Sequence, residues 1–371
     1  MADYIYRRIS FQVKACELFA FDSVLKLSYL IWVMVFHVKL AKRNVIMQKL
    51  IFVFSVMILV CLGLSGCQEG NADYTPKAPL FRDPVYDGAS DPSVIFNRTE
   101  KSWWIFYTGR RANIADTSDV KWVHGSDLGI CSSNDGGRTW IYRGTARGLE
   151  FEEGRNTFWA PEVVYEAGKY HMYVSYLKGI RASWIGDRNI IHYSSDNLMD
   201  WKFESIIPLS SNAVIDPCVY KLGGKWRMWY KDEADNSHTY AADSNDLYSW
   251  KVAGPVLTDF NHEAPNVFKW KGYYWIAIDT WKGIGIYRSD DGYKWTHCPN
   301  ILVEPGERDT DKGHGQHPDI LVQGDRAFIF YFTYPQPGSR SVLQVAELEF
   351  KDEQLVCDRN KIFDLKLKDV K

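Results

Sequence analysis

The chain has 371 residues and a formal net charge of −2, and hydrophobic residues make up 46% of it. This length allows one large domain or two modest ones, with a sizeable core. Because nucleic-acid binding needs a strong basic excess, a charge this close to zero argues against a nucleic-acid partner. Aromatic residues make up 15%, an excess typical of a sheet-rich fold or of a surface that stacks on flat apolar rings.

The cysteines form no CxxC pair, which argues against a zinc or redox motif. We expect those beyond residue 67 to be free thiols. The seven are Cys16, Cys61, Cys67, Cys131, Cys218, Cys298 and Cys357.

Residues 47–67 resemble a bacterial lipoprotein signal peptide. A short basic start at Met47 precedes an apolar run from Leu50 to Leu64, and Ser65-Gly66-Cys67 follows it. A transmembrane helix is the alternative, but the run is short for a full span. We therefore expect a lipid anchor at Cys67 as the only membrane attachment. It would place the protein at a bacterial cell envelope, in the periplasm or on the outer membrane surface.

Residues 1–46 precede what already reads as a complete signal, although they carry a second apolar patch from Leu30 to Val38. We expect the natural start at Met47, with residues 1–46 an upstream extension that is not part of the mature protein. Residues 68–78 then form a polar linker, and residues 79–371 form the folded domain.

Five segments of the chain begin in the same way, with one residue, a proline and an apolar run. Each opening leads through a turn into an aromatic-rich strand, such as Trp103–Tyr107. Repetition of this kind indicates a repeat architecture. The openings are Asp91-Pro92, Ala160-Pro161, Asp216-Pro217, Ala264-Pro265 and His317-Pro318.

Four of the five units close with a serine/aspartate turn that ends in a tryptophan, namely Trp140, Trp201, Trp250 and Trp295. The aspartate can cap the turn while the tryptophan packs beneath it. Such units, repeated without helices between them, predict an all-β fold, a five-bladed β-propeller. A two-sheet sandwich is the alternative, but it would not need the same opening five times. The fifth unit lacks the turn, and we expect its missing strand to come from Pro79 to Tyr86.

In a propeller the first strands of all blades line one central channel, so the residues before the five prolines should be neighbours in space. Asp91, Asp216 and His317, with Glu263 one residue before Ala264, would then meet at one mouth. Like charges at close range raise each other's pKa, so such a cluster is a candidate functional site. Taken singly, Asp91 and Asp216 could be turn caps, and Glu263 a solvated loop acid.

The order of these openings resembles glycoside hydrolase family 43. The motifs are Asp91-Pro92, Trp159-Ala160-Pro161-Glu162, Ile215-Asp216-Pro217 and His262-Glu263-Ala264-Pro265, within a resemblance that spans residues 80 to 350. It implies an inverting glycosidase in which Asp91 is the general base that activates water and Glu263 is the general acid. Asp216 would tune and orient the acid, because a nearby carboxylate raises an acid's pKa toward the working pH. Ala264 stands where the family usually has glycine, which indicates a divergent member.

The resemblance also implies that the substrate contacts Trp159, Arg110, Glu162 and His317. Trp159 would form a sugar-stacking floor, although a core tryptophan is an equal alternative. Relatives often carry a histidine near a central ion, so His317 is a candidate ligand for a structural Ca²⁺ or Na⁺, or a structural histidine without metal. The implied reaction needs no cofactor.

The implied substrates are plant or algal oligosaccharides, with α-L-arabinofuranosides or β-D-xylosides the leading class. A sialidase is a rival, because Ser133–Trp140 fits an Asp-box, but its arginine opening is missing. Related propellers that act on fructans or on anhydrogalactose-containing algal sugars are a second rival. The third is a non-catalytic glycan-binding propeller at the cell surface.

Overall fold

The computed structural model describes residues 75–335 and 340–370. Residues Asp73–Lys371 form one compact unit. The predicted extension, signal peptide and lipid anchor, and all but the end of the predicted linker, lie outside the described residues. Within the described ranges, no helix is long and apolar enough to cross a membrane.

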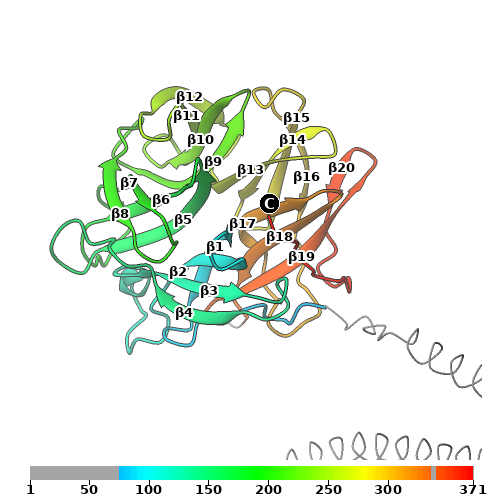
Figure 1. Cartoon of the computed structure of the whole chain (residues 1–371), viewed down its shortest axis with the longest axis horizontal. Coiled ribbons are helices and arrows are strands. Elements are labelled where there is room, and N and C mark those ends of the chain that lie inside the picture. The colour runs from blue at the N-terminus through cyan, green and yellow to red at the C-terminus, as the bar shows by residue number, and fades with distance from the viewer. Residues whose placement is uncertain (1–74, 336–339, 371) are drawn as a thin grey trace, which may run out of the picture. The chain divides into compact units, whose positions relative to one another are not determined.

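The described chain forms five antiparallel sheets of four strands, arranged as the blades of a propeller around a common centre (Figure 1). The predicted all-β, five-bladed fold is therefore confirmed.

Blade 1 contains β1 (Ala89–Asn97), β2 (Ser102–Gly109), β3 (Asp127–Ser133) and β4 (Ile141–Thr145). Blade 2 contains β5 (Thr157–Glu166), β6 (Lys169–Leu177), β7 (Asn189–Ser195) and β8 (Lys202–Ile206). Blade 3 contains β9 (Val214–Leu222), β10 (Lys225–Asp232), β11 (His238–Ser244) and β12 (Lys251–Leu257). Blade 4 contains β13 (Glu263–Trp270), β14 (Tyr273–Asp279), β15 (Ile284–Ser289) and β16 (Thr296–Ile301). Blade 5 contains β17 (Gln316–Gln323), β18 (Arg326–Thr333), β19 (Val342–Lys351) and β20 (Gln354–Val356). One short 3₁₀ turn, η1 (Val120–Trp122), lies between β2 and β3.

The inner strands are apolar on both faces because each blade lies between two neighbours. In β2, side chains alternate between the two sheet faces. Trp104 and Phe106 pack toward blade 2, whereas Trp103 and Ile105 pack toward blade 5. A buried hydrophobic cluster of this kind fills each of the five interfaces between neighbouring blades.

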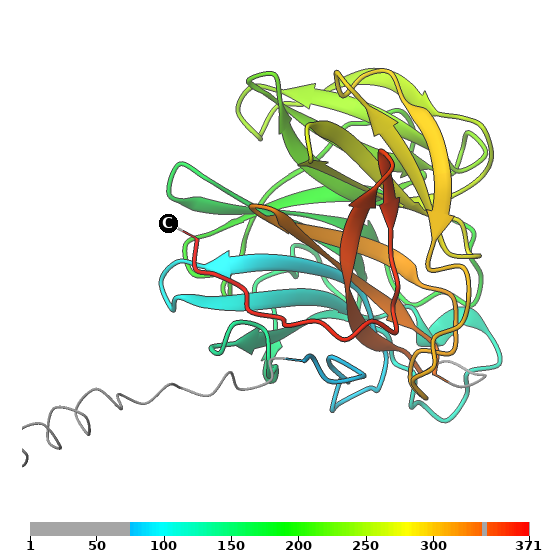
Figure 2. The same ribbon diagram turned by 90° about the vertical axis from the view of Figure 1, so that its right-hand side faces the viewer.

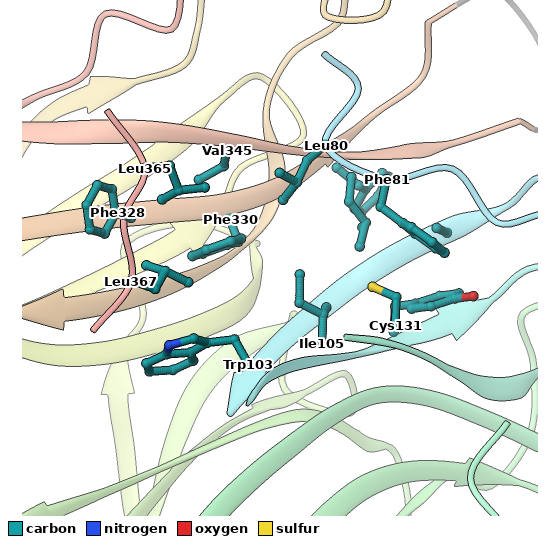
Figure 3. Close-up of a cluster of buried hydrophobic side chains, with 14 of the residues drawn as sticks. Leu80, Phe81, Trp103, Ile105, Cys131, Phe328, Phe330, Val345, Leu365 and Leu367 are labelled. Carbon is teal, nitrogen blue, oxygen red and sulfur yellow. The ribbon is translucent and has the colours of Figure 1, made fainter. Parts of the chain in front are cut away.

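The interface between blades 5 and 1 closes the ring, and both ends of the folded unit take part in it. Leu80 and Phe81 pack beside Leu365 and Leu367 in one cluster with residues from β2, β18 and β19 (Figure 3). The C-terminal segment reaches this cluster as an extended strap after β20 (Figure 2). The prediction that Pro79–Tyr86 supplies the missing fourth strand was wrong. Blade 5 has its own fourth strand, β20, and Pro79–Tyr86 contributes one isolated bridge, Phe81 to Leu343, and no strand.

The predicted closing turns are present, with a serine and a carboxylate or amide two residues later as the caps. In blade 1, Ser133 Oγ accepts the N–H of Gly137 at 2.8 Å, and Asp135 Oδ1 accepts that of Thr139 at 2.9 Å. In blade 2 the cap is Asn197 and not the neighbouring aspartate, because Asn197 Oδ1 receives the backbone N–H groups. An amide oxygen accepts these bonds as well as a carboxylate does.

Each of the five X-Pro openings forms a β-bulge in the first strand of its blade. The register shifts there in all five sheets. The residue before the proline has a left-handed backbone in every case, with φ of 51°, 46°, 57°, 53° and 47° at Asp91, Ala160, Asp216, Ala264 and His317. Because a bulge re-aims the local side chains, this repeated distortion turns the strand starts toward one cavity.

Candidate active site

The three predicted catalytic acids, Asp91, Asp216 and Glu263, line one cavity of about 350 Å³. Arg110, Trp159 and His317 line it too, so six of the seven predicted site residues come together. Residues that the sequence reasoning missed complete the wall, namely Trp122, Val123, Trp184, Lys231, Glu233, Trp281, Gln316 and Tyr334.

The strained openings are held in place by polar groups. The N–H of Asp216 donates to Ser175 Oγ on blade 2 at 2.9 Å, and that of Ala264 donates to Asp216 Oδ2 at 3.1 Å. The N–H of His317 donates to Asp279 Oδ2 on blade 4 at 3.0 Å. Because each bulge interrupts the ladder, these bonds satisfy N–H groups that would otherwise be buried without a partner.

Asp91 is buried and faces two basic side chains. Arg110 Nη2 lies 3.0 Å from Asp91 Oδ1, and His317 Nδ1 lies 3.5 Å from the same oxygen. Burial by itself raises the pKa of Asp91, but Arg110 and His317 outweigh burial and hold that pKa below its usual value. Asp91 is therefore ionised at neutral pH, which is the state that a general base requires.

Arg110, which directly follows β2, is fixed by aromatic residues of blade 5 and by the backbone before β1. Its Nη1 donates to the hydroxyl of Tyr334, and its guanidinium carbon lies 4.8 Å from the centre of the Phe332 ring. Its backbone N–H donates to Gly88 O at 2.9 Å. A Cβ at position 88 would lie 2.1 Å from Arg110 O, so this approach requires glycine.

Glu263 is paired with a lysine that sequence reasoning missed. Lys231 Nζ lies 3.0 Å from Glu263 Oε2 and 3.0 Å from Glu233 Oε1, and Arg188 contacts Glu233 from the other side. Burial raises the pKa of Glu263, but Lys231 outweighs burial and lowers it below the usual value. We expected a neighbouring carboxylate to raise this pKa, and the structure gives the opposite sign.

Asp216 is the member of the trio that keeps its proton to the highest pH. Burial raises the pKa of Asp216 to about 6, against the opposing effects of His317 and Lys231. Ionised Glu263 and Asp91 add to the rise. The three acids therefore divide into an ionised Asp91, a Glu263 held in an ion pair and an Asp216 that is protonated only below about pH 6.

Four tryptophans line the cavity, and Trp159, Trp184 and Trp281 form two of its walls. The Trp159 side chain is buried, and its indole N–H donates to Val123 O at 2.6 Å. Trp184 packs against Trp159 with ring centres 6.2 Å apart and keeps 56% of its surface exposed. Trp281, on blade 4, is 38% exposed. Aromatic faces around a polar floor suit a ligand with both hydroxyl groups and apolar ring faces.

No protein-family model matches the chain. A curated relative, the probable arabinan endo-1,5-alpha-L-arabinosidase C of Aspergillus niger, is 26% identical over 229 residues. That match covers 57% of this chain and 65% of the length of the relative.

Solved structures are similar over most of the described unit. A thermostable family 43 glycoside hydrolase is 20% identical with a TM-score of 0.59, over 78% of this chain and 100% of that one. The chain has the family 43 fold. A GH43_1 enzyme from Xanthomonas citri, solved with xylotriose, is 16% identical with a TM-score of 0.57, over 76% of this chain and 94% of that one. A family 43 β-1,3-galactosidase, solved with galactodeoxynojirimycin, is 17% identical with a TM-score of 0.58, over 74% and 96%.

Glu162 is the one predicted site residue that this family 43 fold does not bring to the cavity. Its Oε1 accepts the N–H of Val219 on the next blade, at 2.9 Å. The equivalent residue of every blade makes the same bond to the next blade, so five bonds form a closed ring. The acceptors are Ser93, Glu162, Cys218, Asn266 and Asp319, and the donors are Val163, Val219, Val267, Ile320 and Val94. This ring lines a separate cavity of about 420 Å³, so Glu162 has a structural role in joining blades.

The surroundings of His317 do not fit the metal ion that the resemblance implied. Its Nδ1 faces Asp91, which already has the Arg110 guanidinium as its counter-charge. In the part of the chain that the structure describes, no three His, Cys, Asp or Glu side chains are grouped to hold a metal. A second cation beside Arg110 would be repelled by its charge.

Proposed function

We propose that the protein is a glycoside hydrolase that uses Asp91, Asp216 and Glu263. The observation that carries the proposal is the electrostatic division of these three acids in one cavity with aromatic walls. Glycosidases need one ionised and one protonated carboxyl group around the scissile bond. The shared family 43 fold supports the same reaction class.

In the proposed reaction, ionised Asp91 accepts a proton from water while the water oxygen bonds to the anomeric carbon. The bond from that carbon to the leaving oxygen breaks, and Glu263 gives its proton to that oxygen. The products are a sugar with the inverted anomeric configuration and a free hydroxyl on the leaving group. Glu263 acts only when it is protonated, so its ion pair with Lys231 has to break first. Asp216, which is protonated below about pH 6, is a nearby source of that proton.

For the substrate we propose an α-L-arabinofuranoside or β-D-xyloside of plant or algal origin. Support comes from the names of the similar proteins, which include an arabinan endo-arabinosidase and an enzyme solved with xylotriose. The cavity accords with this class, because tryptophan walls and charged groups serve the apolar faces and hydroxyls of a sugar.

The test is product release from a panel of aryl glycosides and plant oligosaccharides by the wild type, the Glu263→Gln variant and a Glu166→Gln control. Glu166 lies on the exterior and pairs with Lys221, so its variant should match the wild type. We expect sugar release that Glu263→Gln loses, and NMR of the first product should show the inverted anomer. Release that survives in Glu263→Gln would contradict the assignment of the acid.

A glycan-binding propeller without turnover is the second candidate, and one observation favours it. Glu263 and Asp91 are each neutralised by a basic side chain, as in a site that holds a ligand unchanged. In the same panel, tight binding of one oligosaccharide without release of any sugar would select this function.

We further propose that the mature protein is lipid-anchored at Cys67 in a bacterial cell envelope. Its support is the signal-like sequence of residues 47–67. Labelled palmitate should enter the wild type expressed in a bacterium and not the Cys67→Ala variant. Equal labelling of both would exclude the anchor.

A further inference from the structure

Trp281 stands in a backbone conformation that its side chain does not favour. It follows β14 in the hairpin to β15 and has a φ of 58°, in the left-handed region. Bulky residues rarely adopt this conformation. At the corresponding hairpin of blade 3, the left-handed positions are Asn236 and Ser237, small polar residues that suit a turn better. A smaller residue would adopt this backbone conformation with less strain, yet the chain carries a tryptophan here. Backbone strain of this kind is concentrated at functional sites.

A fully buried acid fixes this strained turn. Asp279 Oδ1 accepts the N–H of Trp281 at 2.7 Å, and Asp279 Oδ2 accepts the N–H of His317. Thr280 Oγ1 closes the hairpin through Gly283 O at 2.8 Å. The backbone of Trp281 is thus anchored to the same carboxylate that holds the opening of blade 5, which fixes the turn that carries the indole.

The indole lies on the side of the cavity that carries Glu263. Lys231 Nζ is 5.4 Å from the centre of the Trp281 ring and 3.0 Å from Glu263 Oε2. The opposite partner in the proposed reaction, Asp91, is held by Arg110 on blade 1. Because a general acid stands beside the oxygen that leaves, the leaving group has to lie on the Glu263 side.

From these observations we infer that Trp281 is the platform on which the leaving-group sugar of an oligosaccharide stacks. This inference rests on the proposed function, because it takes Glu263 as the proton donor. Trp122, Trp159 and Trp184 belong to the adjacent blades 1 and 2, whereas Trp281 belongs to blade 4, so Trp281 lies apart from the other tryptophans of the cavity. The site then takes at least two sugar rings, one on each side of the scissile bond.

The hydrolysis test compares two leaving groups on the glycosyl unit that the wild type releases. One is a second sugar, in the disaccharide, and the other is fluoride, in the glycosyl fluoride, which has no ring to stack. The variant is Trp281→Gly, because glycine suits a positive φ and relieves the turn while removing the indole. We expect kcat/KM to fall about 10-fold or more on the disaccharide, as for one lost aromatic contact, and to stay within about 2-fold on the fluoride.

Trp281→Phe keeps an apolar ring and should recover part of the loss. Tyr293→Ala is the control, since Tyr293 is a 54% exposed aromatic of the same blade that does not line the cavity. Equal losses on both substrates, or none on the disaccharide, would overturn the inference.

A binding experiment distinguishes a failure of this inference from a failure of the proposed function. Calorimetry measures xylose, xylotriose, arabinose and arabinotriose on Glu263→Gln protein, with and without Trp281→Gly. We expect the trisaccharide that binds to lose about 10-fold in affinity while its monosaccharide is unchanged. That result without turnover by the wild type would refute the glycosidase and keep Trp281 as a second-sugar subsite. Unchanged trisaccharide affinity, or no trisaccharide binding to the Glu263→Gln protein, would refute the subsite.

Discussion

Lys231 on β10 forms an ion pair with Glu263 on β13, with Nζ 3.0 Å from Oε2. Both residues line the cavity, and Lys231 is 4% exposed, so water screens the pair weakly. Through this pair, the position of Lys231 controls the pKa of Glu263, the candidate general acid. It therefore sets the pH range over which the site can work.

Lys231→Met should raise the pKa of Glu263, because burial remains while the opposing charge is gone. The active form needs Glu263 protonated, and its protonated fraction falls as pH rises through this pKa. The alkaline limb of kcat/KM should therefore move to higher pH by about 1 pH unit or more. The measurement is a pH profile beside that of Lys225→Met, an exposed lysine on the same strand. An alkaline limb that stays in place would show that Glu263 is not the titrating group.

Arg110→Gln should raise the pKa of Asp91, because Arg110 lowers that pKa more strongly than His317, the other basic group beside it. The active form needs Asp91 ionised, so the acidic limb of kcat/KM should move to higher pH, by about 1 pH unit or more. Arg111→Gln is the neighbouring control, since Arg111 donates to backbone oxygens of residues 121 and 124. If the two variants shift the limb equally, the effect comes from the loop and not from the ion pair.

Asp216→Asn should stabilise the fold increasingly as pH rises from 4 to 7. The folded pKa of Asp216 is raised to about 6 from the usual 3.8, so the folded wild type binds more protons in this window and loses stability as pH rises through it. The gain above pH 6 amounts to at most about 3 kcal/mol. Chemical denaturation of both proteins at pH 4 and pH 7 measures it. A difference that is the same at both pH values would mean that Asp216 does not titrate in this window.

Glu162→Gln should leave kcat/KM unchanged, because Glu162 lies outside the cavity and a Gln oxygen can still accept the Val219 N–H. Glu162→Ala removes the acceptor and should lower the free energy of unfolding by about 1 to 3 kcal/mol. Urea titration and steady-state kinetics on both variants provide the comparison. A large loss of activity in Glu162→Gln at normal stability would return Glu162 to the substrate site.

The repeat made the arrangement of the three acids predictable. Each X-Pro opening occupies the same place in its unit, so the equivalence of Asp91 and Asp216, with Glu263 one residue before the equivalent Ala264, could be predicted before any contact was known. Glu162 occupies an equally regular position, yet it is two residues past Ala160, on the far side of the bulge. A bulge adds one residue and changes where the following side chains point. The sequence does not display that change.

Lys231 and Trp281 were missed because neither belongs to a repeated motif. A signal was present for Lys231, a cation that directly follows the apolar run Met228–Tyr230. Trp281, in a loop, looked like any other aromatic residue among many. Their place in the site depends on contacts between blades 3 and 4, which form only in the folded ring.

By itself, the sequence determined the five-bladed architecture and the convergence of three acids, because both follow from the same X-Pro opening at the start of each of five repeats. Only the tertiary structure decided which acid holds a proton. That depends on burial and on distances of about 3 Å between blades, where Lys231 meets Glu263 and Arg110 meets Asp91. Electrostatic energies change steeply over such distances in a poorly screened interior, and no sequence spacing specifies them.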